Sequence, residues 1–556
     1  MRFFVKKTVG TSENAFFLSF RRKPESRVFE FTGDPGSRVK PGMTAGGMLT
    51  SHLMVFYFSF VFLAAPIANA AETDKATVMI RESETERVIP PMLFGSNIQW
   101  SNQGDGILDS GFPIHWFPGV IDAVKKAGVK SLRFPGGSLA DRYDWKSSVG
   151  PFHQRRDGAG FDGKPVPSYF GTDEFLNLCE LTKAEPVLTI NWNGEPEDAA
   201  DWVDYLEGSV KTRWGAERAK NGRENPRPVI YWEVGNEMYS AVEPGFTDAK
   251  TYAKKYLAFA KAMRSRSKSI KIGINLEASF LQAAWMDKIY PHMKTWNEEV
   301  LQIAAPEVDF GILHFYAPYD TLFLDSNLTR LVLSAPLVFR QNVAEIQKLI
   351  QKYCKKNVEL AVTEYSTFFG EKGPLNPRIH SVEGALFDAL LFFEMMKNPQ
   401  IQMAQHWSLL NNGPFGMLQT EGGSLLSSAK YPIFQRLQSF SLGKLLDMTI
   451  SCPAYSVDAL GNVPRMDSVP VIEGVAVRNT EGRLQIALVN RSVSEILPCR
   501  VQIPEKHALQ FSAVTLVPER GLVVWDSPRN FVLKPDSSGS FSCDLPPLSL
   551  TVISES

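Results

Sequence analysis

The chain has 556 residues, with 59 Lys and Arg against 60 Asp and Glu, which gives a formal net charge of -1. This balance excludes the basic field that nucleic acid or an anionic membrane surface requires, so we expect no nucleic-acid partner. With 44% hydrophobic residues, the chain is long enough to bury one large core and a smaller second one, which predicts two domains.

An apolar run lies close to the N-terminus. Residues 53–72 read LMVFYFSFVFLAAPIANAAE, with small residues at Ala68, Ala70 and Ala71. This pattern predicts a bacterial signal peptide over residues 48–70, cleaved near Ala70, and a secreted or periplasmic protein. The run is short for a membrane span, so we expect no stable membrane insertion.

Some fifty residues precede this run, although a signal peptide should begin a chain. Residues 21–44 are basic and rich in glycine and proline, and they resemble a translated repetitive element found between bacterial genes. We predict that residues 1–47 are a mis-assigned start and that the true start is Met48 or Met54. A disordered extension is the alternative interpretation.

Residues 71–91 contain an alternating stretch, ATVMIRESETERVIP (76–90), which predicts an N-terminal strand that joins a later sheet. From 92 to 428, short apolar runs alternate with longer amphipathic stretches. The predicted strands are 91–100, 129–137, 186–193, 229–237, 270–279, 308–316, 358–366 and 401–409. The predicted helices between them include 117–128, 172–184, 249–266 and 343–354.

Eight strands separated by helices predict an α/β fold, a (β/α)8 TIM barrel over residues 92–428. An open doubly wound sheet is the alternative, but no GxGxxG follows the first strand. In a barrel the carboxyl ends of all strands meet at one rim, where such enzymes carry their chemistry.

Residues 429–556 have a different sequence pattern, with strand-like runs at 471–492, 499–504, 512–518 and 548–554. Turns separate these runs, which predicts a C-terminal antiparallel β-sandwich.

Two of the barrel strands end in glutamate: Glu237 in VIYWEVGNE (229–237) and Glu364 in VELAVTEYS (358–366). Ionised carboxylates are rarely left near a core without a partner. Two carboxyl groups that face each other can cleave a glycosidic bond, because one protonates the leaving oxygen while the other attacks the anomeric carbon. The alternative for either glutamate alone is a salt bridge to a rim arginine.

The motifs around these glutamates resemble a known group of enzymes. WEVGNE (232–237) and TEY (363–365) resemble the acid/base and nucleophile motifs of the clan A retaining glycoside hydrolases. LRFPGGSLADRYDWKSSVGP (132–151) and FGTDEFLNLCELTKAEPVLTINWN (170–193) resemble segments of the family 51 α-L-arabinofuranosidases, and the resemblance covers roughly 76–556. It implies a retaining glycoside hydrolase that acts on polysaccharide or oligosaccharide. No metal or organic cofactor is implied.

The resemblance also implies residue roles. Glu237 would be the general acid/base and Glu364 the nucleophile, while Asn236 would hold the 2-hydroxyl of the sugar. Arg133 would keep the nucleophile ionised. Tyr316 would donate a hydrogen bond to the nucleophile.

Further residues are expected around the pocket. His314 would point into it, and Trp407 would form a platform beneath the sugar ring or pack on top of the barrel. Asn191 and Trp145 are candidates for its wall.

The chain departs from the family pattern in the sugar pocket. Gln99 or Asn97 stands where the family usually carries a sugar-binding glutamate, Ser138 replaces an asparagine, and Ser147 stands where an aspartate is common. Two alternatives therefore stay open: an endo-acting β-glycanase of the same clan, and a non-catalytic carbohydrate-binding barrel.

Overall fold

The computed structural model describes residues 76–85, 87–109, 114–283, 288, 290–320, 328–369, 378–411, 413, 415–503 and 510–556. The predicted mis-assigned start (1–47) and signal peptide (48–70) lie outside these residues. Within the described part of the chain, no helix combines the length and the apolar character needed to cross a bilayer.

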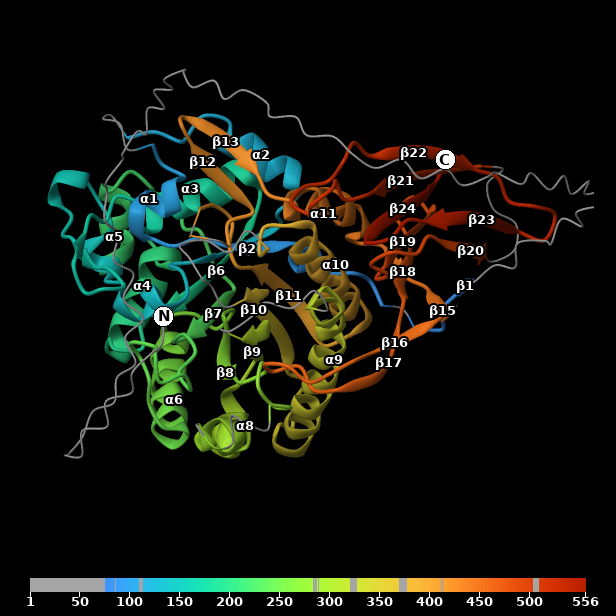
Figure 1. The fold of residues 1–556 in the computed structure, drawn as a ribbon. Helices are drawn as coiled ribbons and strands as arrows, with labels where there is room; N and C mark the ends of the chain where they lie inside the picture. The colour runs from blue at the N-terminus through green and yellow to red at the C-terminus, as the bar shows by residue number, and fades with distance from the viewer. Residues whose placement is uncertain are drawn as a thin grey trace, which may run out of the picture. The chain divides into compact units, whose positions relative to one another are not determined.

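Eight parallel strands form a closed barrel in the order β10-β11-β2-β3-β6-β7-β8-β9 (Figure 1). Their bounds are β2 (Gly95–Asn97), β3 (Ser131–Phe134), β6 (Glu185–Ile190), β7 (Tyr231–Val234), β8 (Lys271–Leu276), β9 (Phe310–Asp320), β10 (Glu359–Phe369) and β11 (Ile401–His406). Each strand overlaps a predicted run, and closure excludes the open sheet. The predicted TIM barrel is confirmed.

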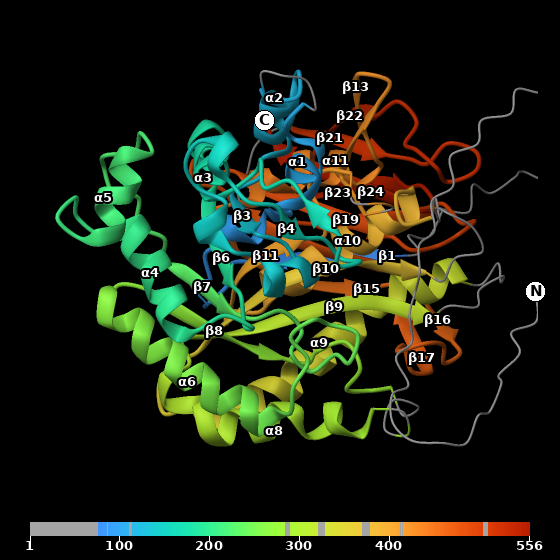
Figure 2. The ribbon, with the colours of Figure 1, turned by 90° about the vertical axis from the view of Figure 1, so that its left-hand side faces the viewer.

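Helices cover the outside of the barrel, and Figure 2 shows α4, α6 and α8 along one side of it. The helices are α1 (Ser101–Gly106), α2 (Val120–Ala127), α3 (Thr172–Thr182), α4 (Pro196–Glu207), α5 (Arg213–Lys220), α6 (Ala249–Arg266), α8 (Pro291–Ala304), α9 (Leu328–Tyr353), α10 (Val382–Lys397) and α11 (Lys430–Leu437). The 3-10 turns are η1 (Pro91–Leu93), η2 (Ser138–Arg142), η3 (Trp145–Ser147), η4 (Phe152–Gln154), η5 (Ala305–Glu307) and η6 (Gln438–Phe440).

Helix α6 shows why these segments are helical. The Asp248 side chain accepts a hydrogen bond from the backbone N–H of Thr251 and so caps the first turn. Tyr252, Tyr256 and Phe259 are buried at helical spacing and pack toward the strands. The predicted helix at 343–354 is the last part of a longer helix, since α9 begins at Leu328. The helix continues through Pro336, which is buried.

Two further sheets follow the barrel. One has the order β15-β1-β20-β23 and the other the order β14-β18-β19-β24-β21-β22. Their strands are β1 (Ala76–Arg81), β14 (Lys444–Leu445), β15 (Asp447–Ser451), β18 (Ile472–Arg478), β19 (Leu484–Asn490), β20 (Leu497–Gln502), β21 (Phe511–Leu516), β22 (Arg529–Leu533), β23 (Ser540–Leu545) and β24 (Ser549–Glu555). The smaller hairpins are β4 (Gly158–Ala159) with β5 (Pro165–Val166), β12 (Leu418–Glu421) with β13 (Ser424–Ser427), and β16 (Ala454–Val457) with β17 (Met466–Pro470).

Strand β1 makes the sandwich differ in one respect from the prediction. It lies between β15 and β20, antiparallel to the first and parallel to the second, whereas the other pairs of the two sheets are antiparallel. Its side chains alternate, so Val78 and Ile80 enter the sandwich core while Thr77 and Met79 are exposed. The domain boundaries at 91/92 and 428/429 stay a prediction.

Candidate active site

Glu237 and Glu364 come from β7 and β10, two strands that β8 and β9 separate in the barrel. Glu237 follows the end of β7 after Gly235 and Asn236, and it has a positive φ of 43°. Glu364 lies inside β10, not at its end as expected, and the strand register shifts between Val362 and Glu364. Such an irregularity re-aims a side chain, and here it accompanies the glutamate that faces the site.

The two carboxyl groups lie close together. One oxygen of Glu237, one nitrogen of His314 and one oxygen of Glu364 are within 4.8 Å of one another. The Glu237 side chain is 21% exposed and the Glu364 side chain 7% exposed. These three ligand atoms are close enough together to hold a metal cation. An arginine, however, already supplies a positive charge next to Glu364.

That arginine is Arg133, at the carboxyl end of β3. Its side chain is fully buried, with Nε 2.6 Å from Glu233 Oε2 and Nη1 2.8 Å from Glu364 Oε1. Although burial lowers the pKa of Arg133, the charges of Glu233 and Glu364 raise it by more, so the guanidinium stays charged. Nη2 donates to Asn236 Oδ1 at 2.9 Å, which joins the cation to the residue before Glu237.

Glu364 has a second donor on its other oxygen. The Tyr316 hydroxyl donates to Glu364 Oε2 at 2.6 Å. Burial and the neighbouring Glu364 raise the pKa of Tyr316 well above its usual value, so the phenol keeps the proton that it donates. Glu364 thus accepts one charged and one neutral hydrogen bond, and both stabilise its ionised form.

Glu237 has a different environment from Glu364. His314 Nδ1 lies 2.9 Å from Glu237 Oε1, and the other ring nitrogen lies 3.1 Å from the Thr363 hydroxyl. His314 therefore connects the two segments that carry the glutamates. These contacts place His314 beside both glutamate segments, and its part in a sugar pocket stays a prediction.

Asn236 is fixed on two sides. Its backbone N–H donates to Asp141 Oδ2 at 3.1 Å, and its side-chain oxygen accepts from Arg133. Burial raises the pKa of Asp141 to about 7, although the backbone N–H groups of Trp192 and Asn236 act in the opposite direction.

Trp407 follows the end of β11 and lies beside Glu364. A Cβ on Gly137 would lie 2.8 Å from Glu364 Oε1 and 2.9 Å from Trp407 Cη2. The glycine backbone therefore lies against both the indole and the carboxylate. The absence of a side chain at Gly137 is what allows this approach.

The strand-one residues are bound within the protein. Asn97 is buried, accepts from Arg133 Nη1 at 3.1 Å and donates to Thr363 O at 2.8 Å. Gln99 is half-buried, and its backbone N–H and its Nε2 both donate to the Asp105 carboxyl group. Burial raises the pKa of Asp105 to about 7.

Two expected wall residues make contacts within the protein, and their place in a sugar pocket stays a prediction. Trp145 stacks with Trp202 on α4 and meets Trp214 on α5, while its Nε1 donates to Asp198 O. Asn191 donates to the Tyr143 carbonyl instead. Both side chains connect loops at the carboxyl ends of the strands to neighbouring segments. Aromatic and amide groups in this position can pack on the protein itself as well as on a ligand.

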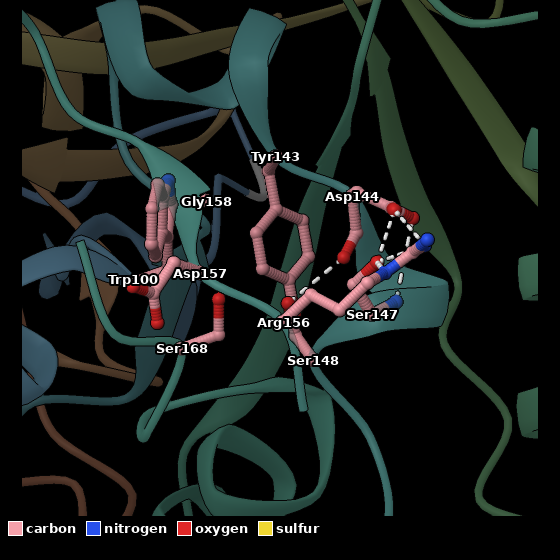
Figure 3. A pocket seen from close by; sticks show the side chains of 9 residues that line it. All are labelled: Trp100, Tyr143, Asp144, Ser147, Ser148, Arg156, Asp157, Gly158 and Ser168. Atoms are coloured by element: carbon pink, nitrogen blue, oxygen red, sulfur yellow. Dashed lines mark hydrogen bonds and ion pairs between the residues drawn. The ribbon is translucent and has the colours of Figure 1, made fainter. Parts of the chain in front are cut away.

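The loop after β3 encloses a separate pocket of about 340 Å³ (Figure 3). Tyr143 lines it, and Arg156 donates hydrogen bonds to Ser147 and Asp144. Ser147, which replaces the aspartate common in the family, therefore contacts this arginine and not the glutamate pair.

Sequence reasoning missed two acids at the site, the half-buried Glu243 and the buried Glu277. Glu243, in the loop after β7, accepts hydrogen bonds from Ser138 and Asn236. Glu277, just after β8, accepts from the backbone N–H groups of Ser279 and Phe280, and burial raises its pKa to about 7. Glu243 stands in a predicted loop and Glu277 inside the predicted strand 270–279, and neither follows an asparagine as Glu237 does.

Known proteins resemble the chain over most of its length. Residues 123–306 match the model of the α-L-arabinofuranosidase 1 domain. A probable α-L-arabinofuranosidase C of Aspergillus clavatus is 27% identical over 70% of this chain and 78% of its own. The GH51 arabinofuranosidase of Xanthomonas axonopodis pv. citri has the same fold, with a TM-score of 0.75, 22% identity, and coverage of 87% of this chain and 100% of its own.

Two bacterial relatives correct the prediction of export. An intracellular exo-α-(1→5)-L-arabinofuranosidase of Bifidobacterium longum is 24% identical over 77% of this chain and 79% of its own. An intracellular exo-α-L-arabinofuranosidase of Bacteroides ovatus is 23% identical over 81% of this chain and 88% of its own. The secreted or periplasmic location predicted from residues 53–72 is therefore wrong. An apolar run followed by alanines is a pattern of composition, and it does not by itself specify export.

The matched domain model, the curated relatives and the barrel with its sandwich lead to one conclusion. The chain is a glycoside hydrolase related to the family 51 α-L-arabinofuranosidases.

Proposed function

We propose that this chain is a retaining α-L-arabinofuranosidase in which Glu364 is the nucleophile and Glu237 the general acid/base. The observation that carries the proposal is the distance between the two glutamates, since an oxygen of each lies within 4.8 Å of the other. Retaining enzymes have carboxyl groups about 5 to 5.5 Å apart, whereas inverting enzymes need about 6.5 to 9.5 Å to admit a water molecule.

In the first step Glu364 attacks the anomeric carbon while Glu237 gives its proton to the leaving oxygen. The glycosidic bond breaks as the glycosyl-carboxylate bond forms. Arg133 and Tyr316 support this assignment, because their hydrogen bonds stabilise the carboxylate form of Glu364. The described contacts of Glu237 include no arginine or lysine, and its side-chain partner is His314, at 2.9 Å, which supports the acid/base role for Glu237.

In the second step Glu237 takes a proton from water, and the hydroxide oxygen attacks the same carbon. Glu364 leaves as a carboxylate, and two inversions restore the original configuration. The sugar class is inferred from the relatives, which are named α-L-arabinofuranosidases. A carbohydrate with terminal arabinofuranose is the proposed substrate.

Aryl glycosides with good and poor leaving groups test the two roles separately. We expect Glu364→Ala to lower turnover of every α-L-arabinofuranoside by roughly three orders of magnitude or more. Glu237→Ala should spare substrates with a good leaving group, because these need no proton. Azide should accelerate Glu237→Ala and give a glycosyl azide of retained configuration. Glu345→Ala, on the exposed face of α9, is the control and should match the wild type.

The outcomes separate the alternatives. Unchanged turnover in Glu364→Ala would refute the mechanism. Activity on β-xylosides or β-glucosides but not on arabinofuranosides would favour the endo-acting β-glycanase. Binding of arabino-oligosaccharide without turnover in the wild type would favour a carbohydrate-binding barrel.

A further inference from the structure

Glu243 is an acid that the proposed mechanism does not use. It lies in the loop that joins β7 to α6, six residues after Glu237, and it is half-buried. Successive turns hold this loop, since the backbone N–H of Ser240 donates to the Glu237 carbonyl and that of Glu243 donates to the Ser240 carbonyl. The position of Glu243 is therefore tied to that of the acid/base residue.

The carboxyl group of Glu243 reaches both sides of the glutamate pair. Oε1 accepts from the Ser138 hydroxyl at 2.9 Å, and Oε2 lies 3.4 Å from Asn236 Nδ2. Ser138 follows Gly137, the residue that packs on Glu364, and Asn236 precedes Glu237. A sugar held between the two glutamates would thus have Glu243 within reach.

A carboxyl group has about four hydrogen-bonding positions. The contacts with Ser138 and Asn236 use one position on each oxygen, so positions remain for a ligand. Gln99, by contrast, has its amide nitrogen on the Asp105 carboxyl group. Among the described acids that the mechanism leaves unused, Glu243 combines partial exposure with contacts to both segments.

We propose that Glu243 is a specificity-determining residue that hydrogen-bonds to a ring hydroxyl of the sugar bound between Glu237 and Glu364. This inference rests on the proposed function, because it places the sugar by the two catalytic carboxyl groups. The loop after β7 then contributes to sugar recognition, together with the Ser138 that departs from the family pattern.

The chemical state of Glu243 sharpens the test. Burial, followed by the negative charge of Glu237, raises the pKa of Glu243 well above its usual value, which favours the protonated carboxyl. A neutral carboxyl can donate one hydrogen bond and accept others, as a glutamine amide does. Glu243→Gln should therefore keep most of the wild-type activity, whereas Glu243→Ala should not.

The experiment compares kcat and KM of wild type, Glu243→Gln and Glu243→Ala on nitrophenyl α-L-arabinofuranoside. It repeats the comparison on the 2-deoxy and 3-deoxy analogues. We expect Glu243→Ala to lower kcat/KM for the full sugar by about 10- to 100-fold, the effect of a lost hydrogen bond in a partly buried site. On the analogue that lacks the contacted hydroxyl, the same substitution should change kcat/KM by less than about twofold, because that bond is already missing.

Val242→Ala is the matched control, because Val242 is the preceding residue in the loop and is 57% exposed. It should match the wild type on all three substrates. Thermal unfolding of each variant reports whether the loop substitution disturbs the fold.

The outcomes distinguish this inference from the proposed function. An equal loss in Glu243→Ala on all three substrates, or no loss on any, would overturn the role of Glu243 while turnover that depends on Glu364 still supports the function. A wild type without such turnover would overturn both. A Glu243→Gln variant as impaired as Glu243→Ala would show that the carboxyl acts in its charged form and would overturn the neutral contact.

Discussion

Gly137, in the loop after β3, lies against Glu364, the proposed nucleophile. A Cβ there would lie 2.8 Å from Glu364 Oε1 and 2.9 Å from the Trp407 ring. Real Cβ atoms do not approach other atoms so closely, so either the carboxylate or the indole would have to move. Arg133 and Tyr316 hold the carboxylate, which leaves little room for adjustment.

We therefore predict that Gly137→Ala lowers kcat/KM by at least tenfold, because small displacements of reacting groups cost about two orders of magnitude in rate. Steady-state kinetics on an aryl glycoside measure the effect. Gly194→Ala is the control, because its Cβ would have the Asn191 carbonyl oxygen as its nearest neighbour, at 3.3 Å. Equal activity of Gly137→Ala and wild type would mean that the site adapts to the added methyl group.

Residue identities predicted that Glu237 and Glu364 lie together better than they predicted the surroundings of the pair. Glu237 after asparagine and Glu364 in TEY stand in short motifs, so their pattern is visible along the chain. Trp145 and Asn191 had no such motif, and their contacts with α4, α5 and the Tyr143 carbonyl come from loop packing. Glu243 went unnoticed because a single acid in a loop carries no periodic signal.

At the scale of elements, β1 is the strand that ties the N-terminal side of the described chain to the sandwich. It is an inner strand, paired with β15 on one edge and β20 on the other. Ile80 is 2% exposed and lies opposite Met448 in the register. The buried alternate residues of β1 thus complete a core that the strands after residue 429 build.

We expect Ile80→Ala to lower the free energy of unfolding by about 2 to 5 kcal/mol, because it removes buried methyl groups and leaves a cavity. Urea unfolding followed by fluorescence measures this change. Thr77→Ala is the control on the exposed face of the same strand and should change the stability by less than about 0.5 kcal/mol. The KM for the aryl glycoside should not change, because β1 does not belong to the barrel; a large KM change would contradict this division.

At the scale of the whole chain, a buried arginine joins the sandwich to the barrel. Arg491 follows β19, is fully buried, and donates to the carbonyl oxygens of Leu333 on α9 and Pro470. Lys397 of α10 lies 2.6 Å from Glu473 on β18, which adds an ion pair between the same two parts. Because these polar groups are satisfied only when barrel and sandwich are in contact, the two parts should unfold together.

Arg491→Ala should lower the free energy of unfolding by about 2 to 5 kcal/mol. The substitution removes the hydrogen-bond donor of two buried carbonyl groups and a charge partner of the Glu473 carboxylate. Calorimetry should resolve the single wild-type transition into two as the interface weakens. Arg483→Ala is the control, since that arginine pairs with Glu481 of its own turn and is half exposed. A single unshifted transition in Arg491→Ala would mean that apolar packing alone couples the two parts.

Local patterns in the chain were enough for the barrel, because strand and helix periodicities repeat within ten residues and eight repeats leave a closed barrel as the main solution. They also singled out Glu237 and Glu364 as a pair, because both lie in short motifs. The parallel pairing of β1 with β20, the position of Glu364 inside β10 and the contact of Glu243 with Ser138 depend on residues that are tens to hundreds of positions apart. Only the folded chain decides these contacts, because closure of the barrel brings distant segments together while no local pattern records their distance.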